Sequence, residues 1–385
     1  MGVDELADSP KKRAHWDDTL FTVIILLIVI GLVILYSSSA YNGRIKFQDQ
    51  FYYLKKQGFA ALVGILGMYI VAKIDYRVWK PFAVWGYIAA ILLSTAVLFI
   101  GDEYNGSKRW LSFGPVSFQP SEYAKLAVIV FLAFLICRLA GDEKGQNVNT
   151  RKKRFVPGSS GIKLRYLMLA LISILPIVAL VGSNNLSTAI IILGIAVILV
   201  FVATPTYRQF IWMCAAGSGF MTIFLALESY RLERLAIWKN PEKYEKGYQT
   251  LQGLYAIGSG GLFGTGLGNS VQKLGFLPEA QNDMIFSIIC EELGLIGTTF
   301  IIILFLILIW RFYSIASHTK DYFGTLLVAG VMGHMMIQIL LNIAVVTNTI
   351  PNTGITLPFI SYGGTSIVFL LLEMGLVLSV SSLIE

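Results

Sequence analysis

Long apolar runs separated by short polar segments dominate the chain. A run of about 20 apolar residues can cross the hydrocarbon core of a bilayer, which is about 30 Å thick. Lipid offers the backbone no hydrogen-bond partners, so a crossing run must be helical. The pattern therefore predicts ten membrane-spanning helices, near residues 19–40, 57–73, 81–101, 120–140, 164–182, 185–203, 207–227, 285–310, 324–346 and 358–382.

Composition agrees with this pattern. The chain is 56% hydrophobic and 14% charged, whereas soluble domains are about 45–50% apolar and about 25% charged. The predicted fold is an all-α, polytopic integral membrane protein, with a cytoplasmic tail over 1–18 and a single membrane domain over 19–385. The first apolar run is long and follows a charged tail, so we interpret it as a retained span rather than a cleaved signal peptide.

Lysine and arginine are unevenly distributed between the two sides of the predicted bundle. With the N-terminus in the cytoplasm, the cytoplasmic segments hold 17 of these residues and the outer segments hold 12. Short cytoplasmic loops carry an excess of Lys and Arg, as does the predicted cytoplasmic loop 141–163 with its "RKKR". Both termini are therefore expected in the cytoplasm. The net charge of +7 needs no nucleic-acid partner to explain it, because the Lys and Arg residues mostly mark the topology, and we expect no such partner.

The longest connection covers residues 228–284 on the predicted outer side. Loops of this length are usually functional or disordered, and the aromatic and apolar residues here argue against disorder. We expect a short interfacial helix at 248–258. The following "IGSGGLFGTGLGNS" lacks the Gly-Lys-Ser/Thr ending of a nucleotide-binding loop. Two alternatives stay open: a turn-rich loop, or backbone that approaches a phosphate or sugar at Gly266 and Gly268.

The stretch "QPSEYAK" opens the fourth predicted span. Glu122 and Lys125 are three residues apart, so they can meet on one helix face. A lysine embedded in a membrane is a functional-site hypothesis by default. Either the pair only orders the helix, or Lys125 serves a site together with Gln119 and Ser121. Arg109, in the preceding loop, is either a surface residue or a bidentate phosphate ligand.

Three carboxylates accompany the eighth predicted span. Glu291 and Glu292 lie about 12–14 Å deeper than Asp283 along a helix. Charge at that depth is costly unless it is compensated, so we expect both glutamates in one structural network with Glu122 and Lys125. Asp283 lies at the outer mouth, where it suits either a general base or a charge partner for the helix N-terminus.

The stretch "IPNTGITLPFISYGGTS" interrupts the tenth predicted span at its outer edge. Interrupted backbone at membrane depth is tolerated where it lines a cavity. We therefore predict an outer-facing polar cavity with Ser361 and Gly363 in its wall. The three cysteines, Cys137, Cys214 and Cys290, show neither a metal-ligand spacing nor a disulfide framework, and we expect them to be unpaired.

Three stretches together resemble the SEDS family (shape, elongation, division and sporulation) of bacterial peptidoglycan polymerases. They are "GSKRWLSFGPVSFQPSEYAKL", "AIGSGGLFGTGLGNSVQKLGFLPEAQNDMIFSIICEELG" and "TGITLPFISYGGTS", and they occur in family order across nearly the whole chain. The segments "GTGLGNSVQK" and "NNLSTAIII" are more similar to the FtsW and SpoVE branch than to the RodA branch.

The resemblance implies a membrane glycosyltransferase that polymerises lipid II, an undecaprenyl-pyrophosphate disaccharide-peptide, during cell division or sporulation. The catalytic aspartate of the family falls on Asp283, which would act as the general base of an inverting reaction. The family's Glu, Lys and Arg fall on Glu122, Lys125 and Arg109, and the two cations are candidates for stabilising the leaving pyrophosphate. No cofactor is certain; a divalent cation, Mg²⁺ or Mn²⁺, between phosphate and Asp283 stays open.

The resemblance also implies partners and a location. The implied partners are a class B penicillin-binding protein that supplies the transpeptidase and other division or sporulation membrane proteins. The implied location is the bacterial cytoplasmic membrane. Two departures concern substrate positioning: Gln281-Asn282 stand where the family often has His-Thr, and residues 183–185 read "SNN" where many relatives carry an acid. A lipid II flippase and a non-catalytic division scaffold are the alternative functions.

Overall fold

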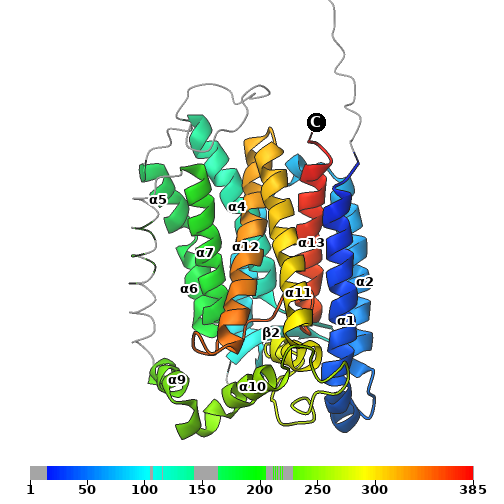
Figure 1. Ribbon diagram of the computed structural model, residues 1–385. Helices are drawn as coiled ribbons and strands as arrows, with labels where there is room; N and C mark the ends of the chain where they lie inside the picture. The colour runs from blue at the N-terminus through cyan, green and yellow to red at the C-terminus, as the bar shows by residue number, and fades with distance from the viewer. Residues whose placement is uncertain are drawn as a thin grey trace, which may run out of the picture.

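The computed structural model describes residues 15–384 apart from 105–106, 115, 143–163, 205–210, 220–228 and the even-numbered positions 212–218. The described chain is a bundle of helices that run roughly side by side (Figure 1). Eight of its helices are long and apolar enough to cross a membrane. They are α1 (Asp18–Phe47), α2 (Tyr52–Lys73), α3 (Ala83–Ile100), α4 (Pro120–Asp142), α7 (Leu186–Ala203), α11 (Ile285–His318), α12 (Tyr322–Val346) and α13 (Gly364–Ser381).

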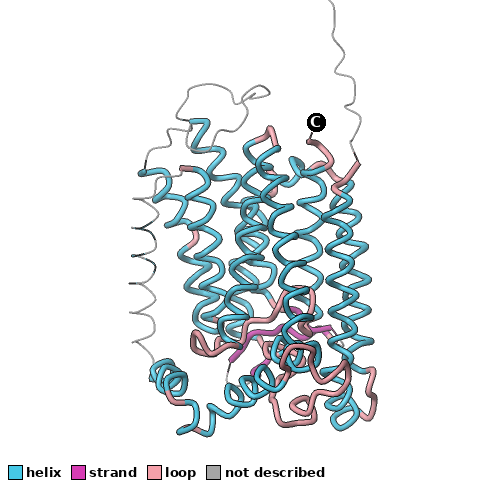
Figure 2. Tube along the Cα trace, viewed as in Figure 1, coloured by secondary structure: helices cyan, strands magenta, loops and turns pink. Residues whose placement is uncertain are grey.

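Shorter elements complete the fold, and many of them gather at one end of the bundle (Figure 2). They are η1 (Tyr76–Trp79), β1 (Asp102–Tyr104), β2 (Ser107–Phe113), β3 (Val116–Phe118), α5 (Leu164–Ser173), α6 (Leu175–Asn184), α9 (Ser229–Lys239), η2 (Pro241–Lys243), η3 (Glu245–Gly247) and α10 (Tyr248–Ser259). The helix predicted at 248–258 is confirmed as α10. The small antiparallel sheet, in the order β1-β2-β3, was not expected in an all-α fold.

Eight of the ten predicted spans have a long helix as their counterpart. The span predicted at 164–182 is instead two short helices, α5 and α6, because Pro176 in the first turn of α6 lacks the N–H that would continue the ladder. The span predicted at 207–227 lies mostly outside the described residues. The last span begins later than the predicted residue 358, because 358–360 form a turn and α13 begins only at Gly364.

Helices α2 and α13 make the most extensive contact in the bundle. Two glycines permit it: a Cβ on Gly64 would lie 2.6 Å from Leu371 Cδ1, and one on Gly375 would lie 2.7 Å from the Met68 carbonyl oxygen. Small residues commonly allow such close backbone approach between membrane helices. Cys137 and Cys290 are free thiols as expected; Cys214 lies outside the described residues.

The glycine-rich segment after α10 docks into a break in α11. Gly294 has a φ of 63°, which interrupts the helix. The freed carbonyl oxygens of Glu291 and Glu292 accept hydrogen bonds from the backbone N–H groups of Thr265 (2.9 Å) and Gly266 (3.0 Å). Backbone that would otherwise be unsatisfied is thereby paired. The glycine-rich segment is therefore a turn-rich loop with a structural role. Whether its backbone also approaches a phosphate or sugar stays a prediction.

Both described ends of the chain lie at the same end of the bundle, opposite α9, α10 and the sheet (Figure 1). Asp17 caps α1 by accepting from the Leu20 N–H (2.8 Å), and its carboxylate also pairs with Arg311 near the end of α11. Two chain ends on the same side require an even number of membrane crossings, and the ten predicted spans meet this requirement.

Candidate active site

Asp283 lies in the turn that leads into α11, at the end of the bundle that carries α10 and the sheet. Its side chain is buried. The segment after α12 passes beside it, since a Cβ placed on Gly354 would lie 3.9 Å from Asp283 Oδ2. A carboxylate thus stands next to the interrupted backbone that the sequence predicts as a cavity wall.

The electrostatic surroundings of Asp283 favour a proton acceptor that works near neutral pH. Burial raises the pKa of Asp283 to about 7, the nearby Glu279 carboxylate adds to the rise, and Arg234 opposes it. A general base is most effective when its pKa lies near the working pH. A carboxyl with such a pKa could accept a proton near neutral pH, and whether it does so here stays a prediction.

Arg234, on α9, brings positive charge to the same region. Its Nη1 donates to the Asn352 carbonyl (3.1 Å), and Asn352 Oδ1 in turn accepts from the Gly354 N–H (3.0 Å). Trp238, one turn further along α9, donates to the Asn348 carbonyl (2.9 Å). Helix α9 is therefore attached to the segment beside Asp283, and its guanidinium is a candidate partner for an anionic substrate group.

A first set of buried polar side chains joins α4, α12 and α13. The ion pair predicted within α4 is confirmed: Lys125 Nζ lies 3.1 Å from Glu122 Oε1. Lys125 also donates to Gln338 Oε1 (3.1 Å), which lies 2.8 Å from His334 Nε2, and His334 Nδ1 lies 2.8 Å from Glu373 Oε2. We call these five residues the bundle cluster.

A second set surrounds the two deep glutamates of α11. Glu292 accepts from Lys273 Nζ (2.7 Å) and Ser37 Oγ (2.7 Å), while Glu291 accepts from the Val271 N–H (2.9 Å) and from the Ser270 hydroxyl. We call Ser37, Ser270, Lys273, Glu291 and Glu292 the loop cluster.

The expected single network of Glu122, Lys125, Glu291 and Glu292 is wrong. Within the described chain the two α11 glutamates bond to the loop cluster and not to Lys125. The reason is that the glycine-rich segment folds back onto α11 and brings its own lysine and backbone donors. The buried acids are therefore held in two separate clusters.

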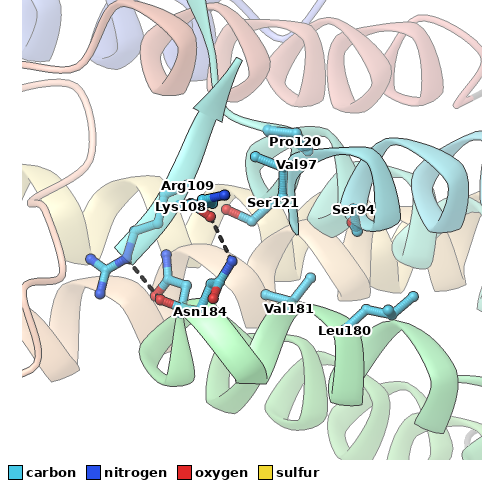
Figure 3. A pocket seen from close by; sticks show the side chains of 10 residues that line it. Ser94, Val97, Lys108, Arg109, Pro120, Ser121, Leu180, Val181 and Asn184 are labelled. Atoms are coloured by element: carbon cyan, nitrogen blue, oxygen red, sulfur yellow. Dashed lines mark hydrogen bonds between the residues drawn. The ribbon is translucent and has the colours of Figure 1, made fainter. Parts of the chain in front are cut away.

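Arg109 lies on β2, where it borders a small pocket between β2, α3, α4 and α6 (Figure 3). Its Nε donates to the Asn184 carbonyl (2.8 Å), and the Asn184 amide donates to the Lys108 carbonyl (2.6 Å). These bonds orient Arg109 at the end of α6. Asn184 belongs to the "SNN" segment, and it holds the sheet through a neutral side chain.

Three of the other predicted substrate-binding residues, Ser121, Ser361 and Gly363, have hydrogen-bond partners within the chain. Ser121 lines the same pocket and accepts from Gln119 Nε2 (3.0 Å). Gln57 on α2 donates to the Ser361 carbonyl (3.2 Å) and accepts from the Gly363 N–H (3.0 Å). Gly268 has a φ of 88°, which a side chain would strain. None of these contacts tests substrate binding, which stays a prediction.

Sequence reasoning missed several of the residues that the fold brings together. Lys273 and Arg234 were counted only as outer-loop charges, and His334, Gln338 and Glu373 were hidden within apolar spans. Ionisable residues inside predicted spans are a functional signal, so His334 and Glu373 could have been found by that rule. The partners of Lys273 and Arg234 depend on how the long connection folds.

The model of the FtsW/RodA/SpoVE family, described as cell cycle proteins, matches residues 17–384. Stage V sporulation protein E of Bacillus subtilis is 37% identical over 375 residues, covering 96% of this chain and 98% of that protein. The chain belongs to the FtsW/RodA/SpoVE family. A probable peptidoglycan glycosyltransferase FtsW from Geobacter metallireducens is 34% identical, covering 97% of this chain and 96% of that protein.

Solved structures agree with this membership of the FtsW/RodA/SpoVE family. A chain from a structure titled "Structural coordination of polymerization and crosslinking by a peptidoglycan synthase complex" has a TM-score of 0.75 and 25% identity, covering 95% of this chain and 97% of that chain. The rod shape determining protein RodA of Thermus thermophilus has a TM-score of 0.67 and 26% identity, with 95% and 96% covered. The helical, multi-pass membrane fold is therefore confirmed, with the small sheet β1-β2-β3 as an addition that the all-α prediction did not include.

Proposed function

We propose that this chain is a peptidoglycan glycosyltransferase that polymerises lipid II, with Asp283 as the general base. The observation that carries the proposal is the buried Asp283 carboxyl, with a pKa raised to about 7, beside an interrupted outer segment in a member of the FtsW/RodA/SpoVE family. Its similarity to probable peptidoglycan glycosyltransferases of the FtsW type supports the reaction class.

The proposed reaction is a single displacement. The 4-hydroxyl of the acceptor sugar attacks C1 of the donor sugar, the C1–O bond to the pyrophosphate breaks, and Asp283 accepts the hydroxyl proton. One in-line step inverts the α linkage to β, so no covalent intermediate forms. Asp283 must be deprotonated at the start, which its raised pKa still permits at neutral pH.

Positive charge is available for the leaving pyrophosphate. Strand β2, which carries Arg109, and helix α9, which carries Arg234, both lie at the end of the bundle where α10 is found, and guanidinium groups bind phosphate bidentately. Lys125 is buried, and two of its contacts go to Glu122 and Gln338, so we assign it to orienting the site. Among the described residues no group of three His, Cys, Asp or Glu side chains could hold a metal; a divalent cation would need the substrate phosphates as further ligands.

We place the active end on the outer face of the cytoplasmic membrane, with both termini in the cytoplasm. The excess of Lys and Arg on the terminal side supports this orientation. Cysteine labelling of intact cells should reach a probe at Asn240, on the outer side, but not one at Asn147 in the cytoplasmic loop. Labelling at Asn147 would reverse the orientation.

The proposed partner is a class B penicillin-binding protein, together with other division or sporulation membrane proteins. The similarity to a chain from a solved peptidoglycan synthase complex supports a partner of this kind. Lipid II itself is the proposed substrate, and its polyprenyl tail explains why an active site would open towards the bilayer.

The bundle cluster bears on the flippase alternative, because it takes polar groups into the membrane interior. His334, Gln338 and Glu373 are each at most 2% exposed. They bond to one another and are packed within the bundle, which suits a static network better than a hydrated path for a sugar headgroup. The polymerase therefore fits the polar groups better than the flippase.

The decisive experiment uses purified full-length protein and its Asp283→Asn variant with lipid II, with glycan length read on gels. The change keeps the side-chain shape and removes the proton acceptor, so polymer should fall about 10²–10⁴-fold. Thermal unfolding in detergent and partner binding should stay unchanged. Near-normal polymer from folded Asp283→Asn, free of other polymerases, would refute the assignment and favour the scaffold or the flippase.

A further inference from the structure

Helix α12 carries a polar stripe on an otherwise apolar surface. His334, Gln338 and Asn342 are spaced four residues apart, so they follow one face of the helix. All three are at most 2% exposed. Three buried polar side chains in a row within a membrane-spanning helix call for a specific use.

Asn342 joins two backbone segments of the site. Its Nδ2 donates to the Asp283 carbonyl (2.8 Å) and to the Ile355 carbonyl (2.7 Å). Both partners are acceptors only, so the amide has one possible orientation. Asp283 lies in a turn, outside the regular backbone hydrogen bonding of a helix. The bond from Asn342 therefore restrains the position of the Asp283 backbone.

The side-chain amide of Asn342 destabilises the fold in a way that an apolar side chain of similar size would not. Its Oδ1 is buried without a hydrogen-bond partner in the described chain, and leaving a buried acceptor unsatisfied is destabilising. A leucine would fill the space without that loss. Retaining asparagine therefore makes sense if its two donated bonds are needed.

Gln338 repeats the arrangement one turn away. Its Nε2 donates to the Thr356 carbonyl (3.1 Å), which turns Oε1 towards Lys125 Nζ (3.1 Å) and His334 Nε2 (2.8 Å). Because Oε1 only accepts, His334 Nε2 carries a proton. The segment that Asn342 holds at Ile355 is thus held again at Thr356, next to the bundle cluster.

We propose that Asn342 is a positioning residue for Asp283, and that Gln338 ties the same assembly to Lys125. Asn342 and Gln338 both bond to the segment 354–356, so together they would fix the distance between Asp283 and Lys125. The inference rests on the proposed role of Asp283. Misplacement of a reacting group by about 1 Å can cost about 10²-fold in rate, so a rigid link of this kind affects turnover more than substrate affinity.

The test compares Asn342→Leu with Thr325→Val in purified full-length protein. Thr325 is also a buried polar residue of α12, but it bonds to the Asp321 carbonyl (3.1 Å) at the other end of the helix. Asn342→Leu loses two hydrogen bonds and Thr325→Val loses its bond to Asp321, so both variants should lower the unfolding temperature. Only Asn342→Leu should lower kcat, by about 10²-fold, with the KM for lipid II changed by less than about threefold.

The pH profile separates positioning from stability. Asp283 is faced by Glu279 from its own turn and by Arg234 from α9. Loosening the turn admits water, so the acid limb of the kcat profile should move to lower pH in Asn342→Leu and stay in place in Thr325→Val. Asn342→Ser, which keeps one hydroxyl donor, should be intermediate in kcat and serves if the leucine variant does not fold.

Two failures are distinguishable. If Asp283→Asn is inactive while folded Asn342→Leu or Asn342→Ser keeps wild-type kcat and acid limb, Asn342 does not position the base and only this inference is overturned. If Asp283→Asn remains active, the proposed function fails and the inference fails with it.

Discussion

The loop cluster and the bundle cluster each place a lysine beside buried carboxylates, but they differ in how completely the carboxylate oxygens are bonded. In the loop cluster all four oxygens of Glu291 and Glu292 have partners. In the bundle cluster, Glu122 Oε2 and Glu373 Oε1 are buried without a hydrogen-bond partner in the described chain. We call the loop cluster saturated, because each of its carboxylate oxygens has a hydrogen-bond partner, and the bundle cluster unsaturated, because two of its carboxylate oxygens have none.

This difference suggests different roles: the loop cluster would anchor the glycine-rich segment, and the bundle cluster would serve the reaction. A cluster in which every carboxylate oxygen has a hydrogen-bond donor is held in one geometry, which suits the glycine-rich segment docked on α11. Buried unsatisfied groups in native proteins need an explanation such as a catalytic role or bound water. The unsaturated bundle cluster adjoins, through Gln338 and Thr356, the segment beside Asp283. We therefore expect damage to the first to reduce stability and damage to the second to reduce turnover.

The largest expected effect is Lys273→Met in the loop cluster. Removing one partner of a buried ion pair costs about 3–5 kcal/mol, because the other charge stays buried and uncompensated. The unfolding temperature and folded yield should drop far more than the activity per folded molecule. Lys55→Met is the matched control: Lys55 and Asp49 also lie 2.8 Å apart but are exposed, so its loss should be under about 1 kcal/mol. Equal losses in both variants would contradict the anchoring role.

A second test breaks the docking of the glycine-rich segment at Gly294. Gly294→Ala places a side chain at a φ of 63° and a Cβ 2.6 Å from the Leu262 carbonyl oxygen. The strain should destabilise the protein by about 1–3 kcal/mol, measured by thermal unfolding. Gly258→Ala in α10 is the control, since a Cβ there meets nothing within 4 Å, and it should be neutral or slightly stabilising. An unaffected Gly294→Ala would mean that the break is not required.

A third test asks whether Glu122 and Lys125 act as one unit. Glu122→Gln, Lys125→Met and the double variant form a cycle measured by thermal unfolding and by kcat. The double variant should be less damaging than the sum of the single variants, with a coupling of about 0.5–3 kcal/mol. Full additivity would show that the 3.1 Å contact contributes nothing.

The smallest expected effect concerns the pH dependence of polymerisation. Asp283 must be deprotonated to accept a proton, so activity should fall as the pH drops through about 7. Arg234 lowers the pKa of Asp283 and Glu279 raises it. Arg234→Gln should therefore move the acid limb to higher pH and Glu279→Gln to lower pH, each by less than about one unit. Shifts in the opposite directions would exclude Asp283 as the titrating group.

Local patterns were enough to predict much of this protein. Apolar length alone predicts membrane helices, because a bilayer sets the required length and forbids unpaired backbone. The three-residue spacing of Glu122 and Lys125 predicts their ion pair, since a helix places such residues on one face. The family resemblance pointed to Asp283, and the structure places that residue where a base could work, although its catalytic role stays a prediction.

Contacts between distant segments were decided only by the tertiary structure. The sequence paired Glu291 and Glu292 with Lys125 because all were ionisable and predicted to be deep, but the fold paired them with Lys273 and Ser37 instead. The break at Gly294 that admits the glycine-rich segment has no local signature beyond a glycine. Likewise, Asn342 and Asp283 are 59 residues apart in the chain. Helix spacing is a property of neighbouring residues, whereas a partner across the bundle depends on how every intervening segment packs.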